Sequence, residues 1–442
     1  MRRVVAVILD GLRRDFVCAD TTPNLVRLQE RSEWFGEHRS AIPSVTRVCS
    51  SVFTTGCQPA RHGLEGNTMA LLEDGRFRIH DAGHPHFLQH KRRVTGASLE
   101  RPGLAELLKD HGGSIVYSNV SPGAAYAHDP DGNGHVYHRA GSFGPGRLPL
   151  TDKDALKIDG DIGGDRMMTE RFIADALTTR RPAFALLWLG HPDTTQHEFP
   201  LGSPEHLAAL EEADRHAGLV IDRVDALRAA GDEVILIVGS DHGHQTVHEV
   251  IDVEAEIARL GFAEALSAGD LVVVPNGTAV LIYASKAGQD RISDLALRLN
   301  EQRWAGEMFH GTVLALIGQS PARGLALFLS MAADEGLNAF AVPGRSFAAK
   351  PLAGKPDRLG CGQHGGLGAY EQAPFLMIEG DAFVPGRTRT DATSLTNIAP
   401  TILRHLQHPT AGCDGKALQD GADTDHANFN SQREMDHVNE AE

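Results

Sequence analysis

Three short apolar runs, each followed closely by an acidic residue, constrain the fold of this chain most. They are residues 4–9 (VVAVIL), 184–189 (FALLWL) and 234–239 (VILIVG), and none of them alternates with polar residues. An uninterrupted apolar run of this length is typical of a strand that is buried on both faces of a parallel sheet. Segments with helical spacing lie between the runs. We therefore predict an α/β fold with a doubly wound, largely parallel sheet between helices.

The acidic residues after these runs predict where a site lies. Asp10 follows the first run, Asp193 comes shortly after the second, and Asp241 comes shortly after the third. In open α/β sheets, ligands bind outside the carboxyl ends of the strands. The three carboxylates are therefore expected to meet in one crevice.

The pattern of predicted elements changes between residues 246 and 355, where a Pro-Asn-Gly hairpin signal, a helical stretch and further short strands follow one another. We predict a catalytic core of residues 1–245 and 356–410, a smaller α+β cap insertion of residues 246–355, and a polar C-terminal tail of residues 411–442. Residues 118–147 are rich in Gly and Pro, with His and Tyr between them. This stretch is predicted to be a long loop that lines the site.

Composition excludes several classes of partner. The formal net charge of −16 argues against a nucleic-acid surface, because a phosphate backbone requires clustered Lys and Arg. No stretch approaches the roughly 18 consecutive apolar residues of a membrane span. The five cysteines form no Cys-x-x-Cys pair, which favours reduced thiols. We expect a cytoplasmic protein without a membrane partner, and the sequence leaves its oligomeric state open, a homodimer included.

Histidines accompany the acidic residues in a pattern typical of metal sites. His197 lies one helical turn after Asp193, His242 is adjacent to Asp241, and His364 stands in the glycine-flanked segment GQHGG. Mixed carboxylate and imidazole ligands suit Zn2+, with Mn2+ or Fe as alternatives. With the carboxylate after the first run there are six candidate ligands. That number is too large for one open catalytic zinc and fits two ions with three protein ligands each.

Taken in order, the motifs resemble the alkaline phosphatase superfamily, in particular its type I phosphodiesterase/nucleotide pyrophosphatase branch, and are also similar to phosphonoacetate hydrolase. They cover about three quarters of the chain: VVAVILDGLRRD, TPNLVRL, PSVTRVCSSVFTTGCQPARHGLEGN, GHPDTTQH, LIVGSDHGH, GQHGG and TNIAPTIL. The resemblance implies two zinc ions side by side, one held by Asp193, His197 and His364 and the other by Asp10, Asp241 and His242.

The segment SVTRVCSSVFTTGCQPARHG (residues 44–63) contains Cys57-x-Pro-x-Arg61, which on its own reads as a sulfatase signature. The resemblance implies a nucleophile ten residues before the glycine of a Thr-Gly step. Counting back from Gly56 gives Thr46, whose oxygen would also contact a metal ion. The sulfatase-like string is therefore interpreted as a coincidence of composition.

Four residues are candidates for substrate contacts. Arg47 can form a forked contact to phosphate oxygens, with a structural ion pair as the alternative. Asn67 is a second donor for a phosphate oxygen, and Tyr126 lies in the Gly-rich stretch. Cys49 stands where the resemblance implies an asparagine that binds phosphate.

These features predict a two-metal hydrolase of phosphodiester or related phosphoryl bonds. It would act on a small phosphorylated substrate through a covalent phosphothreonine. A phosphonate hydrolase on the same site is the first alternative; it would need cations for a substrate carboxylate, and Lys91 to Arg93 are candidates. A non-catalytic metal-binding scaffold is the second alternative, although a scaffold has no use for a reactive hydroxyl at Thr46.

Overall fold

The computed structural model describes residues 2–419, and its centre is a ten-stranded mixed sheet. The strand order is β21-β2-β20-β11-β1-β10-β6-β7-β8-β9. The middle of the sheet is parallel and consists of β11 (Glu233–Gly239), β1 (Arg2–Leu9), β10 (Phe184–Leu189), β6 (Ser114–Ser118) and β7 (His135–Tyr137). The three apolar runs are thus the neighbouring strands β11, β1 and β10. The predicted α/β fold class is confirmed.

Short strands complete the two edges of this sheet. Beyond β11 lie β20 (Leu376–Glu379), β2 (Glu33–Phe35) and β21 (Thr388–Arg389), and β20 is antiparallel to β11. Beyond β7 lie β8 (Ser142–Gly144) and β9 (Leu148–Leu150), both antiparallel to their neighbours.

Both faces of β1 are buried, which explains why its sequence does not alternate. Val4, Ala6 and Ile8 enter one hydrophobic cluster, and Val5, Val7 and Leu9 enter another on the opposite face. The first cluster includes side chains of α2 (Thr46–Thr55), α5 (Leu104–Leu108) and α14 (Ile398–His405). The second includes side chains of α1 (Pro23–Gln29), α7 (Ile162–Phe172) and α9 (Pro204–Ala229). Each fully buried Val or Leu contributes about 1.5 to 3 kcal/mol, so a polar residue on either face would be costly.

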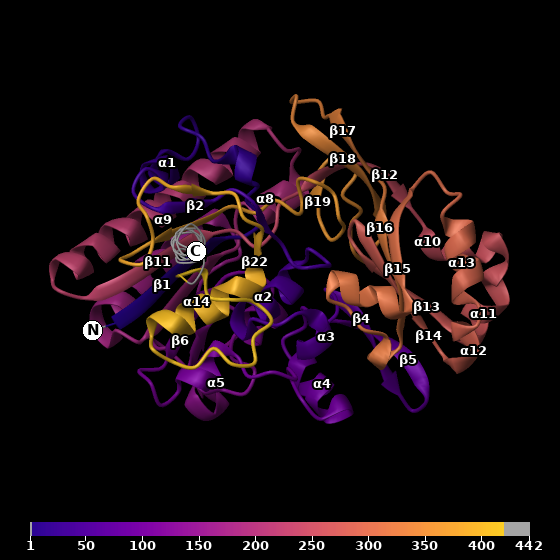
Figure 1. The fold of residues 1–442 in the computed structure, drawn as a ribbon, viewed down its shortest axis with the longest axis horizontal. Helices are drawn as coiled ribbons and strands as arrows, with labels where there is room; N and C mark the ends of the chain where they lie inside the picture. Colours follow the sequence, from indigo (N-terminus) through magenta and orange to yellow (C-terminus); the bar gives the residue numbers. More distant parts are fainter. Residues whose placement is uncertain (1, 420–442) are drawn as a thin grey trace, which may run out of the picture.

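A second unit lies beside the core, on the right of Figure 1. One of its sheets is antiparallel, with the order β13 (Leu271–Asn276), β14 (Ala279–Ala284), β16 (Leu325–Met331) and β15 (Ala305–His310). The other has the order β17 (Ala333–Leu337), β18 (Pro343–Ala349), β12 (Gln245–Ile251) and β19 (Gly362–Gln363). Helices α10 (Val253–Ile257), α11 (Ala263–Ala268) and α13 (Ile292–Leu299) share a hydrophobic cluster with these sheets. The hairpin expected at Pro-Asn-Gly is confirmed as β13–β14. The boundaries of the cap stay a prediction.

Residues 118–147 are not the long loop that the sequence predicted. They contain α6 (Pro122–Ala127), β7 and β8, and the two strands extend the central sheet. Pro122 sits in the first turn of α6, where the missing N–H costs no hydrogen bond. The small residues Ala124 and Ala125 are fully buried. Gly and Pro here mark the ends of short elements that the composition alone concealed.

The start of the predicted tail packs on the core, since Ala417 and Leu418 are buried. Residues 420–442, the rest of that tail, lie outside the described residues. Within residues 2–419, no helix combines the length and the apolar character needed to span a membrane.

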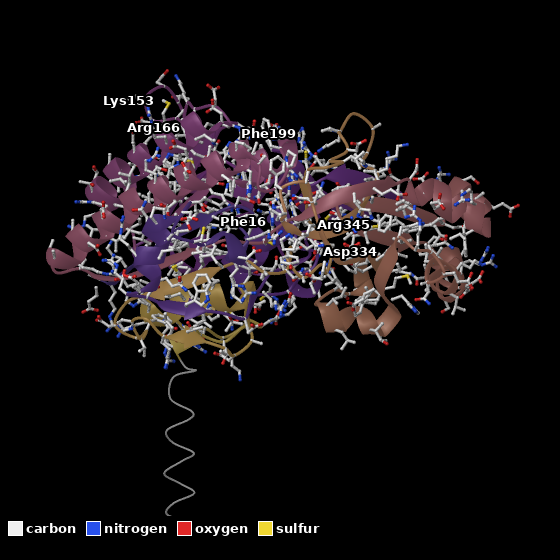
Figure 2. All side chains as sticks on the ribbon, turned by 90° about the horizontal axis from the view of Figure 1, so that it is seen from above. Phe16, Lys153, Arg166, Phe199, Asp334 and Arg345 are labelled. Carbon is white, nitrogen blue, oxygen red and sulfur yellow. The ribbon has the colours of Figure 1, made fainter. Side chains whose placement is uncertain are left out.

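The hairpin of β4 (Thr68–Glu73) and β5 (Arg76–Asp81) borders the second unit, since the Thr68 N–H donates to Asn276 Oδ1 of β13 at 3.1 Å, and α4 (Phe87–Thr95) follows this hairpin. Figure 2 shows Lys153 and Arg166 at the upper edge of the core in that view, and Asp334 and Arg345 on the second unit. The ion pair of Arg345 with Asp334, with an N–O distance of 3.0 Å, joins β18 to β17.

Candidate active site

The structure brings all six predicted metal ligands together, five after the neighbouring strands β1, β10 and β11 and the sixth after β19 of the second unit. Asp10 follows β1, and Asp193 and His197 lie on α8 (Asp193–Glu198) after β10. The remaining ligands follow β11 and β19. They form two groups, one of Asp10, Asp241 and His242 and one of Asp193, His197, His364 and, in addition, His244. Within each group the ligand atoms lie within 4.8 Å of one another.

The carboxylates of the first group each leave one oxygen without a donor. Trp188 Nε1 donates to Asp10 Oδ2 at 2.9 Å, and the Gly11 N–H donates to Asp241 Oδ1 at 3.2 Å. The other oxygens, Asp10 Oδ1 and Asp241 Oδ2, are buried and accept no hydrogen bond from a described residue. His242 Nε2 lies 3.5 Å from the first and 3.3 Å from the second. A cation between these three atoms would satisfy both oxygens, which are otherwise costly to bury.

The second group is built in the same way around Asp193 Oδ1, which is also buried without a hydrogen-bond donor among the described residues. His197 Nε2 lies 3.5 Å from this oxygen and His364 Nε2 lies 3.4 Å from it. Zinc bonds of about 2.0 to 2.1 Å in a tetrahedral arrangement separate neighbouring ligand atoms by about 3.4 Å. The spacing of both groups therefore matches that of ligands around a single ion.

Backbone carbonyls fix the orientation of the histidine rings. The Nδ1 atom of each ring faces a carbonyl oxygen: His242 faces Gly243 at 3.1 Å, His197 faces Gly362 at 3.0 Å, His364 faces Ser44 at 2.7 Å and His244 faces Gly11 at 3.2 Å. Because a carbonyl can only accept, Nδ1 carries the proton and the Nε2 lone pair points at the carboxylates. Partners of this kind hold the imidazole ligands of metal sites. Burial lowers the pKa of both His242 and His244 to about 3, so the rings are neutral.

The raised pKa values of the carboxyl groups also indicate that cations bind at this site. Burial raises the pKa of Asp241 to about 8. Burial, Asp241 and Asp193 together raise the pKa of Asp10 well above its ordinary value. Carboxyl groups in this environment ionise at neutral pH only when positive charge lies beside them. The donor set, its spacing and its unsatisfied oxygens therefore fit two divalent ions.

Thr46 is the first residue of α2 and faces this site. Its Oγ1 atom lies 3.2 Å from His242 Nε2 in the first group. It also lines a cavity of about 350 Å³ together with Asp193 and His364 of the second group. The hydroxyl thus contacts the first group, and Thr46 shares the cavity with the second.

Two of the four predicted substrate contacts line the cavity. Arg47 and Asn67 both do so, and Asn67 Oδ1 accepts a hydrogen bond of 3.1 Å from the Arg47 N–H. Cys49 and Tyr126 do not, which corrects the sequence-based prediction. The Cys49 thiol lies one turn deeper in α2, 3.7 Å from the carbonyl oxygen of Asp241. The Tyr126 hydroxyl donates to the Gly141 carbonyl at 2.8 Å inside the core.

The cations suggested for a substrate carboxylate, Lys91 to Arg93, also lie elsewhere. Lys91 is fully buried on α4, where its Nζ atom contacts Glu100 Oε1 at 3.6 Å. Arg92 pairs with Asp131 at 2.6 Å. Both are used in structural ion pairs, and neither lines the cavity.

The sulfatase-like string lies at the other end of α2 from Thr46. A ten-residue helix is about 15 Å long, so Cys57 is far from the metal ligands. The Cys57 thiol donates to the Gly412 carbonyl at 3.3 Å, and Arg61 pairs with Asp414. Burial raises the pKa of this thiol, which makes it a poor nucleophile. The string anchors the segment after α14.

We expect a Cys57→Ser variant to keep turnover within about twofold of the parent protein, because the thiol touches no group of the site. The measurement is kcat/KM on a phosphoryl substrate and on a sulfate ester. Loss of either activity in a variant that keeps its thermal stability would contradict the assignment of Cys57 as structural.

His244 was not among the predicted ligands, although the second histidine of SDHGH was a signal. Its Nε2 atom lies 3.0 Å from Asp193 Oδ1, closer than those of the predicted ligands. A Cβ atom on Gly11, which has a φ of +69°, would come within 2.5 Å of His244 Cε1. A glycine at this turn therefore makes room for the ring. Because its Nε2 lone pair faces Asp193, His244 is placed to share the ion of the second group.

A His244→Gln variant is expected to lower the metal affinity of the second group by about 10- to 100-fold, the usual effect of losing a partner of a ligand. The measurement is the number of ions per chain after dialysis against graded chelator. His248→Gln is the matched control, because His248 lies on β12 and packs against Phe347. Equal metal retention by both variants across the whole chelator range would rule out this role.

Comparisons with known proteins agree with the sequence motifs. A family model described as type I phosphodiesterase/nucleotide pyrophosphatase matches residues 4–306. An uncharacterized pyrophosphatase/phosphodiesterase of Schizosaccharomyces pombe is 23% identical over 255 residues, which are 54% of this chain and 44% of that protein. The chain therefore spans less than half the length of this curated relative.

Two solved structures share the fold. Murine ectonucleotide pyrophosphatase/phosphodiesterase 5, in an inactive form with AMP, has a TM-score of 0.67 at 16% identity, covering 95% of this chain and 99% of that one. Phosphonoacetate hydrolase from Sinorhizobium meliloti, in complex with phosphonoformate, has a TM-score of 0.65 at 18% identity, covering 92% and 95%.

Proposed function

Since this chain belongs to the type I phosphodiesterase/nucleotide pyrophosphatase family, we propose that it hydrolyses phosphodiester or related phosphoryl bonds through a covalent intermediate on Thr46. The observation that carries the proposal is the position of the Thr46 hydroxyl, which lies 3.2 Å from His242 Nε2 at a cavity that members of both groups of metal ligands line. A non-catalytic scaffold would not require a hydroxyl there.

Each residue of the site has its own role in the proposed reaction. Asn67 holds the start of α2 by accepting from the Arg47 N–H, which fixes Thr46 at the cavity wall. Thr46 Oγ1 attacks phosphorus, the group on the far side departs, and water later hydrolyses the phosphothreonine. Bound divalent ions would lower the pKa of the threonine hydroxyl and offset the negative charge of the phosphoryl group. The Asn67 amide is placed to donate to a phosphoryl oxygen.

Zinc is the ion we propose, because each group combines carboxylate with imidazole, and manganese or iron are the alternatives. A small phosphorylated molecule is the proposed partner, in keeping with the size of the cavity. We propose a cytoplasmic setting because all five cysteines are free thiols.

Phosphonate hydrolysis is the second candidate, and the cavity lining favours keeping it. It would use the same ions and the same threonine, and it would need positive charge for a carboxylate next to the phosphonate. Four cationic side chains line the cavity: Arg47, Arg139, Lys355 and Arg358. They replace Lys91 to Arg93 in this role.

Trapping the intermediate tests the proposed function. Metal-loaded protein is quenched in acid during turnover of a chromogenic diester, and its intact mass is measured. We expect an added phosphoryl group that peptide mapping places on Thr46. An unmodified chain during verified turnover, or fewer than about one bound ion per chain, would rule out the two-metal threonine mechanism.

A further inference from the structure

The walls of the cavity carry charged side chains rather than aromatic ones. Among the described residues that line it there is no Phe, Tyr or Trp. Proteins hold nucleobases largely by stacking them on aromatic rings, which contributes about 1 to 3 kcal/mol per base. The walls therefore provide no stacking platform for a nucleobase, and four cations line them together with the metal-ligand carboxylates and Asp81 and Asp357.

Arg47 differs from the other three cations of the wall because its side chain has no hydrogen-bond acceptor. Lys355 pairs with Asp81 at 2.6 Å, Arg139 donates to Asn119 Oδ1 at 2.7 Å, and Arg358 donates to the His197 carbonyl at 3.0 Å. The Arg47 side chain donates no hydrogen bond to any residue of the described chain, and its Nε atom is buried without an acceptor. Burial lowers the pKa of the guanidinium, and the nearby carboxylate of Asp81 offsets this only in part. A buried guanidinium without an acceptor is costly, so this site is suited to an anionic ligand.

Gly83 fixes the place of this guanidinium. A Cβ atom at Gly83 would lie 2.3 Å from Arg47 Nη2 and 2.9 Å from Asp81 Oδ1. The backbone of Gly83 has no positive φ, so the turn itself does not require glycine. The absence of a side chain therefore makes room for the Arg47 head group beside the cavity. Arg47 lines the same cavity as Thr46, and Asp193 and Asp10 of the two ligand groups are near enough to raise the pKa of its guanidinium, so its charge acts on the place where phosphorus would bind.

Charge balance shows what kind of substrate suits this arrangement. Two divalent ions would exceed the three carboxylates of the two ligand groups by one positive charge. The four cations of the cavity wall exceed its two other carboxylates, Asp81 and Asp357, by two more. A substrate with two negative charges near phosphorus offsets more of this positive charge than a phosphodiester, which brings one.

We propose that this cavity selects substrates with a second negative charge next to the reacting phosphorus, and that Arg47 recognises this charge. The second charge lies either on the phosphoryl group itself, as in a monoester or a phosphonate, or on a carboxylate or phosphate attached beside it. The inference rests on the proposed function, because it assumes that phosphorus binds at Thr46. It narrows that function to small molecules that carry more than one negative charge near phosphorus.

Calorimetric titration of the metal-loaded protein tests the proposal without turnover. The ligands are dimethyl phosphate with one charge, methylphosphonate with two, and phosphonoacetate with an added carboxylate, at a pH where the phosphonates are fully ionised. We expect dimethyl phosphate to bind most weakly. Arg47→Gln should weaken the two phosphonates by roughly 10- to 100-fold, the value of a charged hydrogen bond, and dimethyl phosphate by less than about threefold. If only phosphonoacetate responds, the recognised charge is the carboxylate; if both respond equally, it is the phosphoryl group.

Two further variants and a measurement of diester turnover distinguish a failure of this inference from a failure of the proposed function. Arg47→Lys keeps the positive charge but cannot form the two parallel hydrogen bonds of a guanidinium. Its affinity for the two phosphonates should therefore lie between that of the parent protein and that of Arg47→Gln. Arg345→Gln is the matched control, because Arg345 is paired with Asp334 on the second unit (Figure 2), and it should bind all three ligands normally. If the parent protein turns over a diester through Thr46 while Arg47→Gln weakens all three ligands equally, the inference is wrong and the proposed function stands. If the parent protein neither binds the ligands nor forms the adduct, both are wrong.

Discussion

A Thr46→Ala variant is expected to lose turnover by about 10⁴-fold or more, because removal of a nucleophile leaves only the residual catalysis of the surrounding site. Thr46 Oγ1 is the sole hydroxyl within the described cavity lining that contacts a metal-ligand atom, His242 Nε2 at 3.2 Å. No neighbouring side chain can take its place without a shift of α2. The measurement is single-turnover rate on a chromogenic diester, with intact mass recorded in parallel.

The loss should be chemical rather than structural. Thr46→Ala should bind as many ions as the parent protein, because six other side chains supply ligand atoms, and it should form no covalent adduct. Thr55→Ala is the matched control, since Thr55 ends the same helix and its hydroxyl donates to the Ser51 carbonyl at 2.7 Å. A Thr46→Ala variant that keeps more than about one hundredth of the parent rate would contradict the assignment of the nucleophile.

The centre of the fold was predictable because of a physical requirement that leaves a clear trace in the sequence. A strand covered by helices on both faces must be apolar at every position, and β1, β10 and β11 meet this requirement without interruption. The strands β7 and β8 are three residues long and carry His, Tyr and Gly. Their stability depends on pairing with a sheet that is already formed, which is information that a local pattern does not contain.

The site was predictable as far as its ligands follow strand ends, because chain direction brings those ends together. Which way a neighbouring side chain points was not predictable. Cys49 follows Thr46 by about one helical turn, yet Thr46 opens the helix toward the cavity while Cys49 is held beneath it by the Asp241 carbonyl. His244 follows His242 by two residues and still turns toward Asp193 in the other group. In both cases the contact depends on partners that are distant in sequence.

Removal of the metal ions is expected to destabilise the protein, and to do so increasingly as the pH rises from about 6.5 to about 8. Without ions, burial holds the pKa of Asp241 near 8 in the folded state, whereas its ordinary value is 3.8. In this range the unfolded chain has already lost the proton that the folded chain retains. The free energy of unfolding therefore falls as pH rises, by roughly 2 kcal/mol for Asp241 alone. Asp10, whose pKa is also raised by burial, acts in the same direction.

The pH range from 6.5 to 8 separates the contribution of the carboxyl groups to the free energy of unfolding from that of the histidines. Burial lowers the pKa of His242 to about 3 from an ordinary value of 6.5. Below pH 6.5 this group makes the free energy of unfolding rise with pH, which opposes the effect of the carboxyl groups. Above pH 6.5 it is neutral in both the folded and the unfolded protein. Urea unfolding of chelated and zinc-reloaded protein at several pH values within this range measures the effect. Reloading should restore stability most at the highest pH, because protons then compete least with the ions for the ligands. The chelated Asp241→Asn variant should show a shallower decline than the chelated parent protein, since it lacks one of the two titrating groups. If the free energy of unfolding of the chelated parent protein stays level or rises between pH 6.5 and 8, the prediction is wrong. The buried carboxyl groups would then not need the ions in order to be ionised in the folded protein.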